Sequence, residues 1–110
     1  MFTTISPDEA RLLLEAGAAT LADLRDAESR AAGHIPTSIH LTDQTLAAFV
    51  ANADRDRLVI LYCYHGNMSQ SAARLLDRQG FRQVYSMTGG FAAWRTQFPA
   101  QCTTPDAAAD

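Results

Sequence analysis

The segment from Cys63 to Ser69 holds residue types suited to nucleophilic chemistry. It follows the apolar, β-branched run at residues 58–62 and precedes a helical pattern over residues 69–79. A loop that opens a helix can turn several backbone N–H groups toward one point, where the helix N-terminus adds partial positive charge. A cysteine there is favoured as a thiolate, which is its reactive form. The sequence therefore predicts that Cys63 is a nucleophile in a short backbone cradle, although buried, inert cysteines are common.

The other loop residues suit such a cradle. Gly66 permits the positive φ that a tightly curved loop needs, and Asn67 tolerates left-handed conformations better than most residues. We expect His65 to contribute its backbone N–H rather than its imidazole, because adjacent side chains of a nest usually point outward. The Ser69 hydroxyl can cap the following helix and also lie near the thiolate.

Four polar residues lie outside this loop and are weaker candidates for chemistry. We expect Asp23 and Arg25 to pair or to fix neighbouring loops rather than to act directly in catalysis. His34 and His40 could suggest a metal site with Cys63, but their spacing matches no zinc signature. We therefore expect structural roles for both histidines, and neither a metal nor another cofactor.

Strand and helix patterns alternate along the chain and place the cysteine at a sheet edge. The run at residues 58–62 is typical of a central parallel strand covered on both faces. Shorter strands are predicted at residues 20–24, 38–41 and 84–87, and helices at 7–17, 43–53, 69–79 and 91–98, with a turn or short helix from Arg25. This alternation predicts an α/β domain with a mainly parallel sheet, in which ligands bind outside the carboxyl ends of the strands.

The composition is that of one globular domain. The 110 residues are 47% hydrophobic and 19% charged. We expect a domain at residues 1–99 and a flexible C-terminal tail at residues 100–110, which carries Cys102, the second of only two cysteines. A net charge of −3 without a basic face argues against nucleic acid and anionic membranes as partners. Without a secretory signal or a long apolar stretch, we expect a cytoplasmic protein.

Several motifs together resemble the rhodanese family. They are the segments at residues 23–26, 33–36, 63–67 and 84–94, in this order and spacing. The resemblance spans most of the chain, and in length and loop sequence it is greatest to the single-domain thiosulfate sulfurtransferases of the GlpE type. It implies a single rhodanese-like α/β domain, with a mainly parallel sheet of about five strands and helices on both faces.

The resemblance also implies an activity, that of a thiosulfate:cyanide sulfurtransferase. Cys63 would take the outer sulfur of thiosulfate as a persulfide and pass it to cyanide, a dithiol or an acceptor protein. Inward N–H groups would stabilise the negative charge of the thiolate and of the persulfide. The residues that it implies as substrate-binding are Tyr64, His65, Gly66, Asn67, Met68 and Ser69.

Two residues depart from the family pattern. Met68 occupies a loop position where relatives often have Arg or a small polar residue, so the loop contains no fixed cation. We therefore expect weak thiosulfate affinity with substantial turnover. Arg30 stands where relatives usually have an aromatic residue, and we expect looser packing of that turn.

Other functions compete with the sulfurtransferase hypothesis. A carrier module that passes persulfide sulfur between proteins needs the same loop. A cysteine phosphatase or arsenate reductase is disfavoured, because phosphatases on this fold use a Cys-x5-Arg loop, whereas Ser69 occupies that position and the next arginine is Arg74 in the predicted helix. A regulatory rhodanese domain commonly lacks the cysteine, but Cys63 is present.

Overall fold

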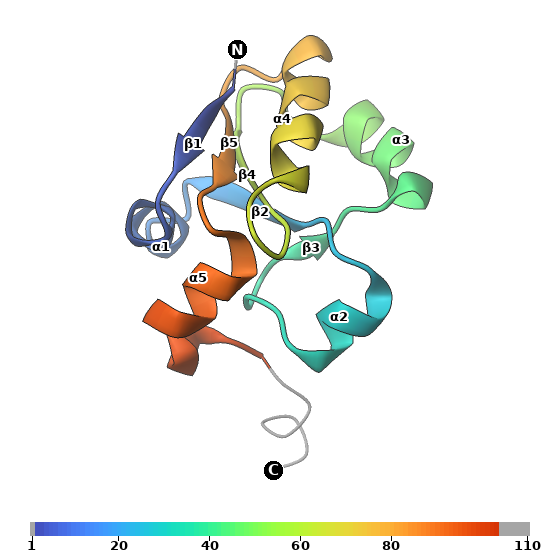
Figure 1. Ribbon diagram of the computed structural model, residues 1–110. Coiled ribbons are helices and arrows are strands. Elements are labelled where there is room, and N and C mark those ends of the chain that lie inside the picture. Colours follow the sequence, from blue (N-terminus) through green and yellow to red (C-terminus); the bar gives the residue numbers. More distant parts are fainter. Residues whose placement is uncertain (1, 104–110) are drawn as a thin grey trace.

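The computed structural model describes residues 2–103, which form one sheet with helices around it (Figure 1). The strands are β1 (Thr3–Ile5), β2 (Ala19–Asp23), β3 (Ile39–His40), β4 (Leu58–Tyr62) and β5 (Val84–Met87). The helices are α1 (Pro7–Glu15), α2 (Ala27–Ala32), α3 (Asp43–Asn52), α4 (Met68–Arg78) and α5 (Gly90–Gln97), followed by a short 3₁₀ helix (Pro99–Gln101). The sheet order is β1-β5-β4-β2-β3 and all its pairings are parallel, which confirms the predicted fold class.

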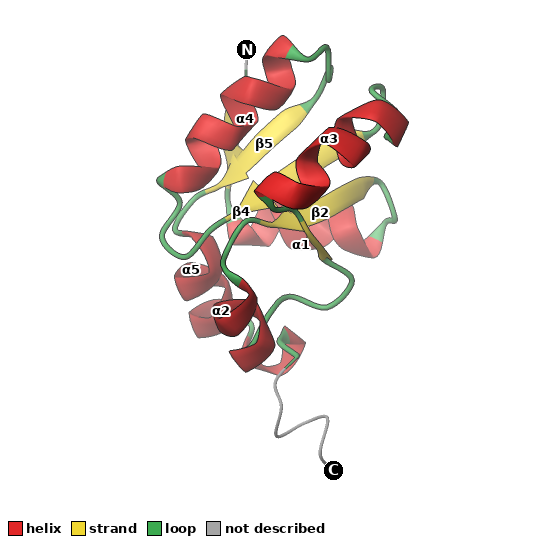
Figure 2. Cartoon of the chain, turned by 90° about the vertical axis from the view of Figure 1, so that its right-hand side faces the viewer, coloured by secondary structure: helices red, strands yellow, loops and turns green. Residues whose placement is uncertain are grey.

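The central strand β4 is covered on both faces. Ile60 and Tyr62 belong to the apolar cluster beneath α1 and α5, whereas Val59 and Leu61 belong to the cluster beneath α3 and α4. Figures 1 and 2 show these two helix pairs on opposite sides of the sheet. Since successive side chains of a strand point to opposite faces, this arrangement requires the continuous apolar run of β4.

The inner strands match the sequence prediction better than the edge strands. β4 and β5 have the predicted bounds, 58–62 and 84–87. β3 is only two residues long, within the predicted range 38–41. β1 was not predicted, because Thr3–Ile5 is short and its first two residues are exposed and polar. Edge strands are commonly short and carry exposed polar residues, so their sequence signal is weak.

The chain after α5 stays in contact with the domain up to Thr103. The indole N–H of Trp94 donates to the Gln101 carbonyl at 3.0 Å. His34 and Thr103 form an antiparallel bridge with N–O distances of 3.0 and 2.7 Å. These contacts extend past the predicted domain boundary at residue 99. The remainder of the predicted flexible tail, residues 104–110, lies outside the described residues.

Candidate active site

Cys63 follows β4 directly, at the carboxyl end of the central strand, and only 4% of its surface is exposed. The Cys63 carbonyl accepts a hydrogen bond from the Phe91 N–H at 2.8 Å, and the Tyr64 carbonyl accepts one from the Ala92 N–H at 3.0 Å. Both donors lie in the first turn of α5, where N–H groups lack partners within the helix. The start of α5 therefore fixes the direction of two peptide groups in the loop.

The loop aims hydrogen-bond donors at the sulfur of Cys63. The Gly66 N–H lies 3.1 Å and the Ser69 N–H 3.3 Å from Sγ, and Gly66 has the positive φ expected of it, at 95°. Burial alone would raise the pKa of the Cys63 thiol. The hydrogen bonds from the Ser69 hydroxyl and from the N–H groups of Ser69, Gly66 and Met68 outweigh burial and hold that pKa below its usual value. The site therefore stabilises the thiolate, the nucleophilic form, relative to that of an ordinary cysteine.

Ser69 contributes its side chain as well as its N–H. Its buried hydroxyl lies 3.5 Å from Cys63 Sγ and 2.7 Å from the hydroxyl of Ser86 on β5. The expected capping role of Ser69 is wrong, because α4 begins at Met68 with Asn67 as its N-cap. Ser69 therefore lies inside the first turn, where its hydroxyl faces the sheet and the sulfur.

The remaining loop side chains lie on the outside. Tyr64, His65 and Asn67 are exposed, and the rings of Tyr64 and His65 contact each other edge to face. Arg95 of α5 donates a hydrogen bond to the Tyr64 hydroxyl. The donors to Sγ in the described structure come from Gly66, Met68 and Ser69. The expected contribution of the His65 N–H is therefore wrong, and the His65 side chain is exposed.

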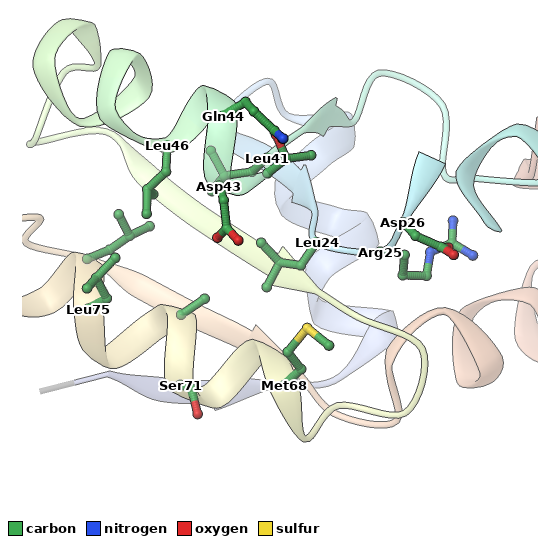
Figure 3. A pocket seen from close by; sticks show the side chains of 13 residues that line it. Leu24, Arg25, Asp26, Leu41, Asp43, Gln44, Leu46, Met68, Ser71 and Leu75 are labelled. Carbon is green, nitrogen blue, oxygen red and sulfur yellow. The ribbon is translucent and has the colours of Figure 1, made fainter. Parts of the chain in front are cut away.

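Met68 borders a pocket beside the loop. The pocket has a volume of about 650 Å³ and lies between α3 and α4, with leucines such as Leu24 and Leu75 in its wall. Figure 3 shows the thioether of Met68 near Leu24. The Met68 side chain is 62% exposed. It therefore places an apolar group, and no cation, at the edge of the loop.

The sequence is similar to a known family along most of its length. Residues 6–97 match the model of the rhodanese-like domain. The chain belongs to the rhodanese family. It is 49% identical to the protein named thiosulfate sulfurtransferase GlpE of Pseudomonas savastanoi, over 89% of this chain and 92% of that one. It is 46% identical to the protein of that name from Pseudomonas aeruginosa strain LESB58, over 96% of both chains.

The fold is similar to solved rhodanese structures. The solution structure of the rhodanese-like domain of an Anabaena protein superposes with a TM-score of 0.77 and 26% sequence identity, over 88% of this chain and 76% of that one. The predicted resemblance to the rhodanese family is thereby confirmed, together with the single-domain architecture implied by it.

Two of the segments that resemble the rhodanese family, at residues 23–26 and 33–36, meet in a buried polar network next to β4. The Asp23 carboxylate is fully buried and accepts hydrogen bonds from Arg25 Nε at 3.1 Å, Arg25 Nη2 at 2.9 Å and the Tyr62 hydroxyl at 2.9 Å. Arg25 Nη2 also donates to the Gly33 carbonyl at 2.6 Å. The expected pairing of Asp23 with Arg25 is thus present, and it ties the end of β2 to the turn after α2.

This network shifts the pKa values of its members. Burial would raise the pKa of Asp23, but the hydrogen bonds from Arg25 and Tyr62 outweigh it and lower that pKa. Burial in the same cluster raises the pKa of Tyr62 to about 12. Asp23 is therefore a carboxylate and Tyr62 a neutral phenol near pH 7, as a structural network requires.

The expectation of looser packing at Arg30 is wrong. Arg30 Nη1 lies 3.3 Å from Asp23 Oδ2 and donates to the Ser38 hydroxyl at 2.8 Å, and Nη2 donates to the Ser38 carbonyl at 2.5 Å. A guanidinium has five N–H donors, so it can join two buried acceptor groups where an aromatic ring would only pack. Arg30 therefore fastens α2 to the chain before β3.

Replacing Arg30 by methionine is expected to lower the free energy of unfolding by about 1–3 kcal/mol, since it removes hydrogen bonds that involve a charged group while keeping the aliphatic stem. Denaturant unfolding measures this change. The exposed Arg78 of α4 provides the matched control, and Arg78→Met is expected to change stability by less than about 0.5 kcal/mol. Equal losses in both variants would show that Arg30 has no fastening role.

Both histidines outside the loop contact backbone carbonyls. A ring nitrogen of His34 lies 3.0 Å from the Arg30 carbonyl oxygen, and one of His40 lies 2.6 Å from the Arg25 carbonyl oxygen. Between residues 2 and 103, no three His, Cys, Asp or Glu side chains gather in a way that could hold a metal ion. Within the same range no helix is both long and apolar enough to cross a membrane.

Two residues at the site were not singled out from the sequence. Ser86 lies on β5 and contacts Ser69, and Gly90 at the start of α5 lies directly against the backbone of Cys63 and Tyr64. A polar residue inside a short buried strand is a signal that could have drawn attention to Ser86. The sequence pattern of a turn at residues 89–90 does not indicate which part of the chain it touches.

Proposed function

We propose that this chain is a thiosulfate sulfurtransferase whose Cys63 carries the transferred sulfur as a persulfide. The observation that supports this most strongly is the convergence of the Gly66 and Ser69 N–H groups on Cys63 Sγ. It occurs in a chain that is 49% identical to a protein named thiosulfate sulfurtransferase GlpE.

In the first step the Cys63 thiolate attacks the outer sulfur of thiosulfate. A bond forms between Sγ and that sulfur, the sulfur–sulfur bond of thiosulfate breaks, and sulfite leaves with the bonding electron pair. Cys63 then carries a persulfide with its negative charge on the terminal sulfur. The N–H groups and the partial positive charge at the start of α4 stabilise an anion in both states, so the same cradle serves thiolate and persulfide.

In the second step a nucleophile attacks the terminal sulfur and restores the Cys63 thiolate. With cyanide as acceptor the product is thiocyanate; a dithiol or an acceptor protein would take the sulfur in the same way. The loop of residues 64–69 binds the substrate anion mainly through its backbone, since the exposed side chains of Tyr64, His65 and Asn67 lie on its outer side.

Phosphatase chemistry is less well supported by the same geometry. A phosphate-binding loop of this type needs an arginine six residues after the cysteine. Ser69 occupies that position, and its hydroxyl is engaged with Ser86. The next arginine, Arg74, is exposed on α4, with its guanidinium 5.5 Å from the centre of the Phe2 ring.

Single-turnover sulfur transfer tests the proposal. Incubation with thiosulfate and no acceptor is expected to release one sulfite per chain, and cyanide added afterwards is expected to yield one thiocyanate. Loading by a cysteine desulfurase in place of thiosulfate would favour the carrier module instead. A cytoplasmic location fits this chemistry, because a reducing compartment keeps Cys63 and Cys102 as the free thiols seen here.

Replacing Met68 by arginine is expected to lower the KM for thiosulfate about two- to fivefold at low ionic strength, because it adds a cation beside a site that now binds the anion mainly with backbone dipoles. Steady-state kinetics at two salt concentrations measure the effect, which should shrink as salt screens the charge.

Leu12 offers a matched control for this change, since it is 61% exposed and lies on α1. The Leu12→Arg variant adds the same net charge away from the loop and should leave KM unchanged. A micromolar KM in the unaltered protein would contradict the expected weak affinity.

A further inference from the structure

The hydroxyls of Ser69 and Ser86 form a short chain that ends at the sulfur of Cys63. Ser86 is 1% exposed and Ser69 fully buried, and their oxygen atoms lie 2.7 Å apart. The Ser69 oxygen lies 3.5 Å from Sγ. Within the described residues the Ser86 hydroxyl has the Ser69 hydroxyl as its only hydrogen-bond partner.

The protons of this chain can be counted in each state of the sulfur. If the Cys63 thiol donates a hydrogen bond to the Ser69 oxygen, the Ser69 hydroxyl must donate to the Ser86 oxygen. The Ser86 hydroxyl is then a buried donor without an acceptor. If Cys63 is a thiolate, Ser86 donates to Ser69 and Ser69 donates to Sγ, so both protons have acceptors. A buried donor without an acceptor is costly, and a hydrogen bond to an anion is stronger than one to a neutral group.

We propose that Ser86 is a positioning residue, which turns the hydroxyl proton of Ser69 toward Cys63 Sγ and thereby favours the thiolate. Among the described residues no hydrogen bond joins Ser86 to the sulfur, so Ser86 acts through Ser69. The inference rests on the proposed function, because it explains how the nucleophile of that reaction is kept ready. It adds a residue from β5 to the hydrogen-bond donors around the sulfur, which otherwise come from the loop and the first turn of α4.

The pH dependence of Cys63 alkylation tests this role. Iodoacetamide labelling of Cys63, followed by mass spectrometry across a pH series, reports the midpoint of the thiol–thiolate equilibrium without any sulfur transfer. The Ser86→Ala variant is expected to move this midpoint to higher pH and to lower single-turnover sulfite release at neutral pH about fivefold, the effect of one ordinary hydrogen bond. An unchanged midpoint would overturn the proposal.

Two further variants separate the hydroxyl from the shape of the side chain. Ser86→Thr and Ser86→Val have nearly the same volume, and β-branched residues suit a strand. The Thr variant should have a lower midpoint than the Val variant, whereas equal midpoints would contradict the proposal even if both variants are less stable than the original protein.

The matched control is Ser38→Ala, which removes another buried hydroxyl, one bonded to Tyr62 rather than to Ser69. It should leave the midpoint unchanged, and a shift equal to that of Ser86→Ala would assign the effect to general loosening. A failure of the proposed function would give a different result. The unaltered protein would then release no sulfite from thiosulfate, whatever the pH midpoint of its alkylation.

Discussion

Replacing Cys63 by serine is expected to reduce sulfur transfer from thiosulfate by at least about a thousandfold. A serine hydroxyl in the same cradle has a far higher pKa than a thiol and forms no stable equivalent of a persulfide. The N–H groups of Gly66 and Ser69 would remain, because they belong to the loop backbone. The loss therefore isolates the nucleophile from the anion-binding cradle.

Mass spectrometry after thiosulfate treatment locates the sulfur directly. The unaltered protein should gain one sulfur atom, Cys63→Ser should gain none, and Cys102→Ser should still gain one. Cys102 is a suitable control because it is partly buried, its Sγ lies 3.7 Å from the Phe98 carbonyl oxygen, and burial raises the pKa of its thiol. Sulfur found on Cys102 instead of Cys63 would refute the assignment.

The features that could be predicted from sequence are those with local causes. The apolar run of β4, the cysteine after it and the glycine at position 66 are neighbours in the chain, and each has a preference that acts over a few residues. The alternation of strands and helices also indicates a parallel sheet, and in such a sheet this loop lies at the carboxyl edge. The cradle could therefore be located before its geometry was known.

The features that could not be predicted depend on how segments that are not adjacent in the chain fold against one another. Arg30 binds Ser38 and Asp23, and Ser86 reaches Ser69 only because β5 lies beside β4 with α4 packed over both. Sequence spacing alone gives no such register. The errors at Arg30 and at the Ser69 cap share this origin, because each assigned a local role to a side chain whose partners come from elsewhere in the fold.

The contact between Gly90 and the loop also joins distant segments, and it leads to the second large expected effect. Gly90 has a φ of 57°, and a Cβ at this position would lie 2.5 Å from the Cys63 carbonyl oxygen and 2.7 Å from the backbone of Tyr64. These are rigid backbone atoms at less than van der Waals distance. An added methyl group must therefore displace the loop or α5, and either movement disturbs the hydrogen bonds from the Phe91 and Ala92 N–H groups.

We expect Gly90→Ala to lower the rate of sulfur transfer per folded molecule about a hundredfold, because a shift of about 1 Å in catalytic groups has effects of this size. Single-turnover sulfite release, corrected for the folded fraction by circular dichroism, measures it. Gly17→Ala is the matched control: Gly17 has a similar φ of 69°, but a Cβ there meets nothing within 4 Å.

Both glycine variants bear the cost of a left-handed residue with a side chain, about 1 kcal/mol or somewhat more. Only the Gly90 variant also presses on the backbone of Cys63 and Tyr64. Equal rates per folded molecule in the two variants would mean that the loop keeps its geometry without support from α5. A loss confined to Gly90→Ala would instead make the first turn of α5 part of what aims the loop at the sulfur, since its two N–H groups hold the carbonyls of Cys63 and Tyr64.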